Sequence, residues 1–288
     1  MILSPATLLI PPPLKRADVV HEAEKLIDQY VDHLGWEAVV ARGLSFDDVY
    51  HDVIYPQYEI ELIEDEDLGT DPDGKKVLGS FDILSNTAYI DKSLRIGSGD
   101  PRRAFTCWHE VGGHGILQGA WLKGQLERGL CAEHLITTEA SLSPATVNQL
   151  ERQANLFAAS ASAPKWLVRA ILVDIFSLNR LFRYAGPGGY NLYVHGKDVP
   201  CRVSSFDHLC QQIAKRIQHR FWGLSVESLT YRVKESGFVI ETSASKVTLR
   251  RTASIRSVRN ASGRPKRRAR AGRMIGACAE RLATVPVG

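Results

Sequence analysis

The hexapeptide His109-Glu110-Val111-Gly112-Gly113-His114 places two imidazoles and one carboxylate close together in this 288-residue chain. Two imidazoles that flank a glutamate can hold Zn²⁺ and set a general base beside it, as in the His-Glu-x-x-His signature of zinc peptidases. In that signature the histidines are four residues apart, whereas His109 and His114 are five apart. One extra glycine therefore separates this segment from a standard metal-binding helix.

The extra residue would place the two histidines on different faces of a regular α-helix. Such a helix turns about 100° per residue, so side chains at i and i+4 lie roughly 40° apart, while those at i and i+5 lie roughly 140° apart. A π-bulge absorbs one residue, and Gly112-Gly113 is the pair most able to adopt that backbone. The segment is similar in this spacing to the zinc helix of dipeptidyl peptidase III. We therefore expect a π-bulge at this pair, which returns the histidines to one face.

A third ligand is predicted on the next helix. Ser143-Pro144 is typical of an N-cap followed by proline at the first helical position, and apolar residues recur at helical spacing behind it. Glu151 lies one residue from that apolar stripe, and Asp100-Pro101 opens the helix of His109 in the same way. Two histidines and one glutamate leave the fourth zinc position open, which is the arrangement of a catalytic site.

Two longer segments resemble the ImmA/IrrE family of metallopeptidases. Residues 102–119 (RRAFTCWHEVGGHGILQG) resemble the family's R-x-F-T-x-x-H-E-x-G-H segment. Residues 151–164 (ERQANLFAASASAP) resemble its E-x-x-A-N-x-F-A-A-x-x-x-x-P segment. Residues 87–91 (TAYID) also resemble the strand that leads into the family's active-site helix.

The resemblance implies a reaction and a role for each residue of the motif. His109, His114 and Glu151 would be zinc ligands, and Glu110 would be the general base. Zinc bound there would activate water and polarise the scissile carbonyl, while Glu110 takes the water proton and passes it to the leaving amine. The substrate implied is a regulatory protein such as a helix-turn-helix repressor, in a stress response or a mobile-element response.

Three features depart from the family pattern. The first is the extra glycine, and the second is Ser160, a hydroxyl where the family usually has an acidic residue. The third is the interval of 37 residues between His114 and Glu151, which is longer than the family pattern predicts. This interval contains three alternatives to Glu151 as the third ligand, namely Glu133, His134 and Glu139.

Other polar side chains lie near the motif or downstream of it. Cys107 lies two positions before His109, but on a regular helix it would project roughly 160° away, so we expect a small core residue. No residue is clearly marked as the group that stabilises the oxyanion. The candidates lie in a downstream glycine-rich loop and are Tyr184, Tyr190, Tyr193 and His195.

Length and composition predict a cytoplasmic chain with one main domain and an appendage. An apolar content of 44% over 288 residues suffices for a substantial core. The chain has no run of about 18 apolar residues, and residues 1–13 are a poor secretory signal because prolines interrupt them. Five cysteines without regular spacing favour reduced thiols over a disulfide framework.

The periodicity and the family resemblance together predict an α+β fold. We expect a mainly helical, zincin-like core with a small three-stranded sheet, followed by a helical, helix-turn-helix-like C-terminal appendage. Besides the two helices of the motif, helices are expected at residues 19–34, 45–53, 165–176, 206–221 and 225–237. Strands are expected at residues 58–63, 77–83 and 87–91, with a turn at 71–74. An edge of this sheet would accept an extended peptide.

The expected organisation is a metallopeptidase core at residues 14–185, a helical subdomain at 186–242 and a basic, disordered tail at 243–288. The tail contains 12 Lys and Arg against one acidic residue, a net charge of +11. Because the whole chain carries +4, residues 1–242 carry −7. Such a tail binds nucleic acid by counterion release, without reading sequence. In the helical subdomain, packing is favoured over DNA recognition because the basic face is thin, consisting of Tyr231, Arg232 and Lys234.

Two classes of function follow. The first is a cytoplasmic zinc endopeptidase that cleaves a transcription regulator. The second is a catalytically inactive regulatory or toxin-like interaction protein with nucleic-acid affinity, in which the altered motif no longer hydrolyses. Bound zinc, and loss of cleavage in Glu110→Gln, would separate the two classes.

Overall fold

The computed structural model describes residues 14–97, 100–119, 121, 123, 144–176 and 182–241. All of these belong to one compact unit, Met1–Glu241. Several predictions concern residues that lie outside the described ranges. These are the absence of a secretory signal at 1–13, the basic tail at 243–288, the N-cap Ser143, and the alternative ligands Glu133, His134 and Glu139.

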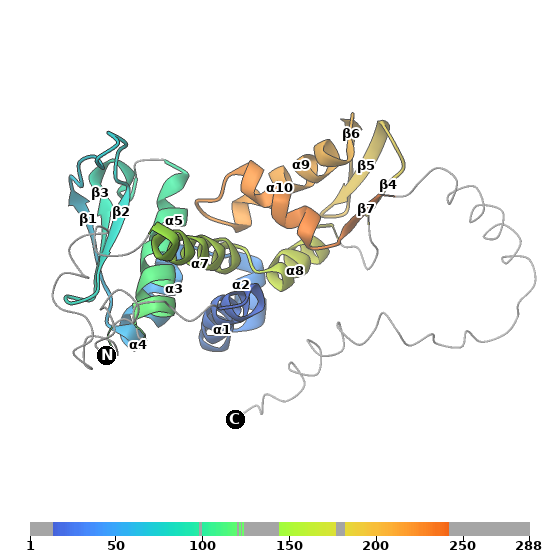
Figure 1. Ribbon diagram of the computed structural model, residues 1–288. Helices are drawn as coiled ribbons and strands as arrows, with labels where there is room; N and C mark the ends of the chain where they lie inside the picture. The colour runs from blue at the N-terminus through green and yellow to red at the C-terminus, as the bar shows by residue number, and fades with distance from the viewer. Residues whose placement is uncertain are drawn as a thin grey trace, which may run out of the picture. The chain divides into compact units, whose positions relative to one another are not determined.

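Helices precede and follow a small sheet (Figure 1). The first half contains α1 (Arg16–Leu34), α2 (Trp36–Arg42), α3 (Phe46–Val49), the π-helix η2 (Tyr50–Ile54), α4 (Tyr55–Tyr58), β1 (Glu61–Glu66), β2 (Gly79–Asp82), β3 (Thr87–Asp91) and the 3-10 helix η3 (Lys92–Leu94). The second half contains α5 (Arg102–Cys107), the π-helix η4 (Trp108–Gln118), α7 (Pro144–Ser162), α8 (Lys165–Phe176), β4 (Phe182–Tyr184), β5 (Gly188–Val194), β6 (Lys197–Val203), α9 (Phe206–Ile217), the 3-10 helix η7 (Gln218–Arg220), α10 (Val226–Glu235) and β7 (Val239–Glu241). This mixture of helices and small sheets is compatible with the predicted α+β class.

The predicted three-stranded sheet is present, with the strand order β1-β3-β2. The central strand β3 runs parallel to β1 and antiparallel to β2, and its register pairs Gly79 with Ile90 and Phe81 with Ala88. Four of the five residues of β3 are buried, as expected for a strand with neighbours on both sides. Strand β2 is therefore an edge strand among the described residues.

The predicted strand at residues 58–63 was placed too early in the chain. Pro56 lies in the first turn of α4, which extends the helix to Tyr58, and Glu59 then adopts a left-handed conformation with φ 52°. The side-chain amide of Asn86 donates to the carbonyl oxygens of Tyr58 and Glu59, which satisfies the end of the helix. The strand consequently begins at Glu61.

Several helix ends lie where the sequence predicts them. Gly35 ends α1 with φ 92° and donates its amide to the carbonyl of Val31. Pro144 is the first residue of α7, and Ser225 caps α10 by accepting a hydrogen bond from the amide of Ser228. Helix α5 begins one residue later than predicted, because Arg102 is its first residue and Pro101 its N-cap. The Asp100 carboxylate, expected as the cap, accepts from the amide of Arg102 at 2.8 Å.

The C-terminal part is less helical than the sequence predicts. Tyr190, Tyr193 and His195 were expected in a glycine-rich loop, yet β5 starts at Gly188 and pairs with β6 in an antiparallel hairpin. His195 and Gly196 form its two-residue turn with φ values of 45° and 81°, the positive values that a type I′ turn requires. A further pair joins β4 to β7 in parallel, so this region is mixed rather than purely helical.

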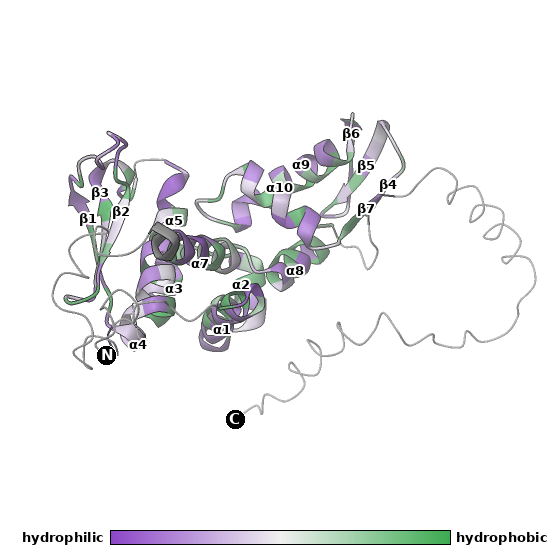
Figure 2. Ribbon diagram, viewed as in Figure 1, coloured by the Kyte–Doolittle hydropathy of each residue, from purple (hydrophilic) through white to green (hydrophobic). Residues whose placement is uncertain are grey.

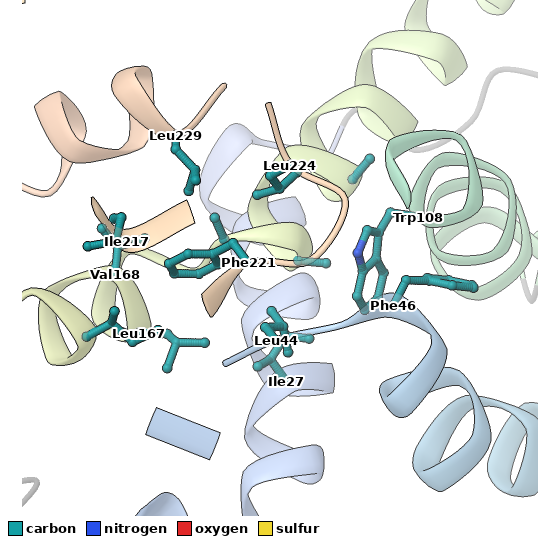
Figure 3. Packing of buried hydrophobic residues seen from close by; sticks show 14 of the residues in the cluster. Ile27, Leu44, Phe46, Trp108, Leu167, Val168, Ile217, Phe221, Leu224 and Leu229 are labelled. Carbon is teal, nitrogen blue, oxygen red and sulfur yellow. The ribbon is translucent and has the colours of Figure 1, made fainter. Parts of the chain in front are cut away.

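The hydrophobic core continues from the N-terminal helices into the C-terminal region. Figure 3 shows Phe221 and Leu224 beside Leu44 and Trp108. The backbone follows the same path, because the amide of Leu44 donates to the carbonyl of Arg220 at 2.8 Å and Leu44 accepts from the amide of Trp222 at 3.0 Å. The segment after α9 therefore helps to enclose the beginning of the motif helix.

Helices α9 and α10 alternate between hydrophobic and hydrophilic colours along the ribbon (Figure 2). The buried residues of α9 are all apolar, and those of α10 are Leu229, Thr230 and Val233. Within the described residues, one helical stretch, Asn148–Phe176, is long and apolar enough to span a membrane by composition. Its most apolar window has a mean hydropathy of 1.3, and 61% of that window is buried inside the protein. This burial is typical of a core helix.

Candidate metal centre

The motif lies on a π-helix rather than on an α-helix with one bulge. Helix η4 covers Trp108–Gln118 and continues directly from α5. Because a π-helix closes its hydrogen bonds between residues i and i+5, it brings side chains five residues apart to a common face. The Nε2 atoms of His109 and His114 accordingly lie 3.0 Å apart. The extra glycine is absorbed as expected, over a longer segment than Gly112-Gly113 alone.

The glycines of η4 make room for its neighbours. A Cβ built on Gly112 would overlap the ring of Phe157, and one on Gly113 would lie 2.5 Å from the Cβ of Ala154. On the other side, a Cβ on Gly115 would lie 2.8 Å from Ile60. The backbone of Gly112 and Gly113 has no positive φ, so these glycines are required for space rather than for an unusual conformation.

Glu151 on α7 completes a group of three potential ligands. Its Oε2 lies 3.2 Å from Nε2 of His109, and its Oε1 lies 3.4 Å from Nε2 of His114. Zinc ligands at about 2.0–2.2 Å in tetrahedral geometry would lie roughly 3.4 Å from one another. The three side chains could therefore hold a metal ion with little rearrangement.

The charges of the three residues are coupled. Hydrogen bonds to His109 and His114 hold the pKa of Glu151 well below its usual range. Burial lowers the pKa of His114, but the hydrogen bond to Glu151 and the charges of Glu110 and Glu151 outweigh burial and raise it. The carboxylate of Glu151 thus supplies the negative charge that a divalent cation would share with two imidazoles.

Glu110 is placed apart from this group, against the sheet. Its side chain is buried, and burial raises its pKa although the nearby charges of His114 and His109 oppose the shift. A Cβ built on Gly79 of β2 would lie 2.6 Å from Oε1 of Glu110, so the glycine leaves space for this carboxylate. A buried carboxyl with a raised pKa is suited to accept and return a proton.

Cys107 and Ser160 do not belong to the group of His109, His114 and Glu151. Cys107 is fully buried in the core, as predicted. Ser160 is also buried, and its hydroxyl has no hydrogen-bond partner among the described residues.

The four oxyanion candidates lie in β4, β5 and the following turn, away from β1–β3 (Figure 1). Tyr184 stacks on Tyr190, whose hydroxyl donates to the carbonyl of Gly186 at 2.6 Å. Tyr193 is 43% exposed, and His195 forms the hairpin turn. None of these described contacts involves His109, Glu110, His114 or Glu151.

Two side chains near the site were not singled out in the sequence. Gln118 lies one turn after His114, and its Oε1 is 2.8 Å from Nδ1 of that ring. Arg103, part of the quoted RRAFT segment, donates to Glu64 of β1 and to Asp47 of α3. The spacing of four residues between His114 and Gln118 is the one sequence signal that could have indicated the contact between these two side chains. The ion pairs of Arg103 with Glu64 and Asp47 depend on tertiary structure and have no such signal.

Neither models of known protein families nor curated protein sequences match the chain. The resemblance to ImmA/IrrE metallopeptidases remains an expectation carried by two motif segments. The function is therefore inferred from the geometry of His109, His114, Glu151 and Glu110.

Proposed function

We propose that the chain is a zinc-dependent endopeptidase, with His109, His114 and Glu151 as ligands and Glu110 as the general base. The observation that carries this proposal is the convergence of two imidazole nitrogens and one carboxylate, with 3.0 Å between the two Nε2 atoms. Imidazole and carboxylate donors suit zinc, and three protein ligands are typical of catalytic zinc sites.

The residues around the ligands support hydrolysis rather than a closed structural site. Zinc, when bound, supplies a Lewis acid that activates water and polarises a carbonyl. Glu110 is not one of the three ligands, and its raised pKa favours uptake of a proton from water and its delivery to a leaving amine. Glu151 is 41% exposed at its side chain, so the group is open to solvent on one side.

The proposed substrate is an extended segment of a protein. Strand β2 is an edge strand among the described residues, and its Gly79 lies against Glu110. A peptide that pairs with this edge would run past the general base, with main-chain hydrogen bonds supplying affinity. By the resemblance to ImmA/IrrE, the substrate would be a cytoplasmic transcription regulator such as a helix-turn-helix repressor.

A second function, non-catalytic binding of nucleic acid, rests on the charge of residues 243–288. This segment carries 12 Lys and Arg against one Glu. Helix α10 contributes little to such binding, because Lys234 pairs with Asp207 at 2.8 Å and Arg232 pairs with Glu235 at 2.6 Å. Nucleic acid is therefore proposed as a partner of the tail alone.

Zinc content tests the proposal first. The parent protein is expected to retain about one zinc per chain after dialysis, measured by atomic emission, whereas His114→Ala is expected to retain much less. His208→Ala is the matched control, because His208 is bonded to Ser204 and Gln212 instead. If the parent protein binds no zinc, the proposal that the chain is a zinc endopeptidase is wrong.

Turnover tests the role of Glu110. Glu110→Gln is expected to keep zinc and to cleave a quenched peptide library roughly 10²–10⁴ times more slowly than the parent protein, because proton transfer is lost. Equal cleavage rates for the two proteins would show that Glu110 is not the general base. Zinc binding without any cleavage by the parent protein would favour the non-catalytic function.

A further inference from the structure

Gln118 connects the two helices that carry the candidate ligands. Its Oε1 lies 2.8 Å from Nδ1 of His114 on its own helix, and its Nε2 donates to the carbonyl of Leu150 at 2.8 Å. Leu150 precedes Glu151 on α7. We propose that Gln118 is a positioning residue of the metal centre, which sets the tautomer of His114 and fixes Glu151 relative to η4. This inference rests on the proposed metal site.

The direction of both hydrogen bonds follows from the carbonyl of Leu150. A carbonyl oxygen can only accept, so the end of the Gln118 amide that contacts it must be the NH₂ group. The opposite end, which faces His114, is then the amide oxygen, and it too can only accept. Hence the Nδ1 atom of His114 carries a hydrogen.

This bond leaves the metal-facing nitrogen of His114 available. A neutral imidazole with hydrogen on Nδ1 has its lone pair on Nε2. That Nε2 is the atom that lies 3.0 Å from Nε2 of His109 and 3.4 Å from Oε1 of Glu151. Gln118 therefore selects the one neutral tautomer in which His114 can bind a metal in this group.

The bond to Leu150 acts on the third ligand. Gln118 and Leu150 are 3% and 8% exposed, so the bond between them is shielded from water. This hydrogen bond fixes the position of the α7 turn that carries Glu151 relative to η4. The Nδ1 atom of His109, in contrast, is buried and has no partner among the described residues. Among the described residues, a side-chain hydrogen bond to Nδ1 therefore orients the ring of His114 but not the ring of His109.

Substitution of such an outer hydrogen-bond partner typically lowers metal affinity 10–100-fold. We expect that loss for zinc in Gln118→Leu, measured by competition with a chromophoric chelator. Gln118→Glu keeps an acceptor for His114 but loses the donor to Leu150, so its affinity is expected to lie between those of the leucine variant and the parent protein. The absorption spectrum of the Co²⁺-loaded parent should show four-coordination, and Gln118→Leu should change it.

Gln218→Leu is the matched control. The Gln218 amide also donates to a backbone carbonyl, that of Leu224 at 3.0 Å, and its described hydrogen bond does not involve an imidazole. This variant should lose some thermal stability but bind zinc as tightly as the parent protein. Gln118→Met, which is closer in length, replaces the leucine variant if the latter does not fold.

The outcomes separate the inference from the function on which it rests. If the parent protein binds no zinc, the proposed function fails. If the parent protein binds zinc and folded Gln118→Leu or Gln118→Met binds it equally tightly, with an unchanged Co²⁺ spectrum, the positioning role is overturned. If the leucine variant loses affinity and Gln118→Glu regains part of it, the role of His114 orientation is supported over a general loss of packing.

Discussion

Gly113 faces Ala154 so closely that a Cβ built on the glycine would lie 2.5 Å from the Cβ of the alanine. Gly113 belongs to the helix of the two histidines, and Ala154 belongs to the helix of Glu151. The distance between these helices decides whether His109 and His114 lie close to Glu151. The grouping of these three side chains therefore requires a residue without a Cβ at position 113.

Gly113→Ala is expected to separate η4 from α7. The added methyl must displace the backbone of Ala154, and overpacking of this kind costs typically about 1–3 kcal/mol of unfolding free energy. Zinc affinity should fall with it, because Glu151 moves away from both histidines. Gly119→Ala is the control, since the nearest atom to its Cβ would be 3.4 Å away. Equal zinc affinity in parent and Gly113→Ala would show that the helix spacing does not limit binding.

Arg103→Ala is expected to destabilise the whole fold. The guanidinium bonds Glu64 at 2.6 Å and Asp47 at 2.8 Å while only 11% exposed, so its loss leaves two carboxylates without their shared cation. Breaking such a pair costs roughly 3 kcal/mol or more in chemical denaturation. Arg103→Lys should recover only part of this, because an ammonium cannot donate in the same planar fork.

The control for Arg103 is its neighbour Arg102. Its side chain is 62% exposed and pairs with Asp100 on the surface. Arg102→Ala should therefore cost less than about 1 kcal/mol. Equal losses in the two alanine variants would contradict a special role for the buried guanidinium.

Asp91→Asn should destabilise the protein at neutral pH but much less in acid. Burial alone would raise the pKa of Asp91, yet hydrogen bonds from Ser93, Lys76 and Leu68 outweigh it and hold the pKa well below its usual range. A group with a lowered folded pKa stabilises the protein above its unfolded pKa of about 3.9 and loses this effect as pH falls towards the folded value.

The measurement for Asp91 is urea unfolding at several pH values. The neutral amide leaves buried donors without their charged acceptor, which costs roughly 1–3 kcal/mol at pH 7. This difference should shrink below about pH 4, where the wild-type carboxylate begins to lose its advantage. Asp67 and Lys92 also belong to this network, through Lys76, so salt is kept constant. Asp73→Asn, a substitution at an exposed turn residue, is the control and should cost little at pH 7.

Removal of residues 243–288 is expected to abolish most binding to duplex DNA. Each phosphate contact made by a Lys or Arg contributes a slope of about −0.9 in log affinity against log salt. The full chain should show a steep slope, and the truncated chain should show little binding at all. Tyr231→Ala, on the exposed face of α10, serves as the control and should leave the affinity unchanged. Strong, salt-dependent binding by the truncated chain would locate the interface elsewhere.

The sequence predicted the elements whose conformation depends on residues close together in the chain. Strand β3 was predicted with the same bounds as in the structure, because Thr87, Tyr89 and Ile90 are β-branched or aromatic residues that follow a polar turn. A π-bulge at Gly112-Gly113 could also be inferred, since the five-residue spacing and two adjacent glycines leave few ways for His109 and His114 to share a face. The extension of the π conformation over Trp108–Gln118 was not predicted.

The features that were missed depend on partners distant in sequence. The hairpin of β5 and β6 was hidden because its turn, His195-Gly196, lacks the usual Asn-Gly or Asp-Gly pair. The bond from Gln118 to Leu150 spans 32 residues and exists only after α7 has packed on η4. No periodicity within either helix contains that information.

The core around Leu44, Trp108 and Phe221 has a consequence for how this protein can be divided (Figure 3). The C-terminal region covers the N-terminal helices, and Arg232 of α10 donates to the carbonyl of Ala159 near the end of α7. Neither half can be transplanted without exposing apolar surface of the other. Recombination within this chain would therefore preserve the group of His109, His114 and Glu151 only when the N-terminal helices and the C-terminal region come from the same parent.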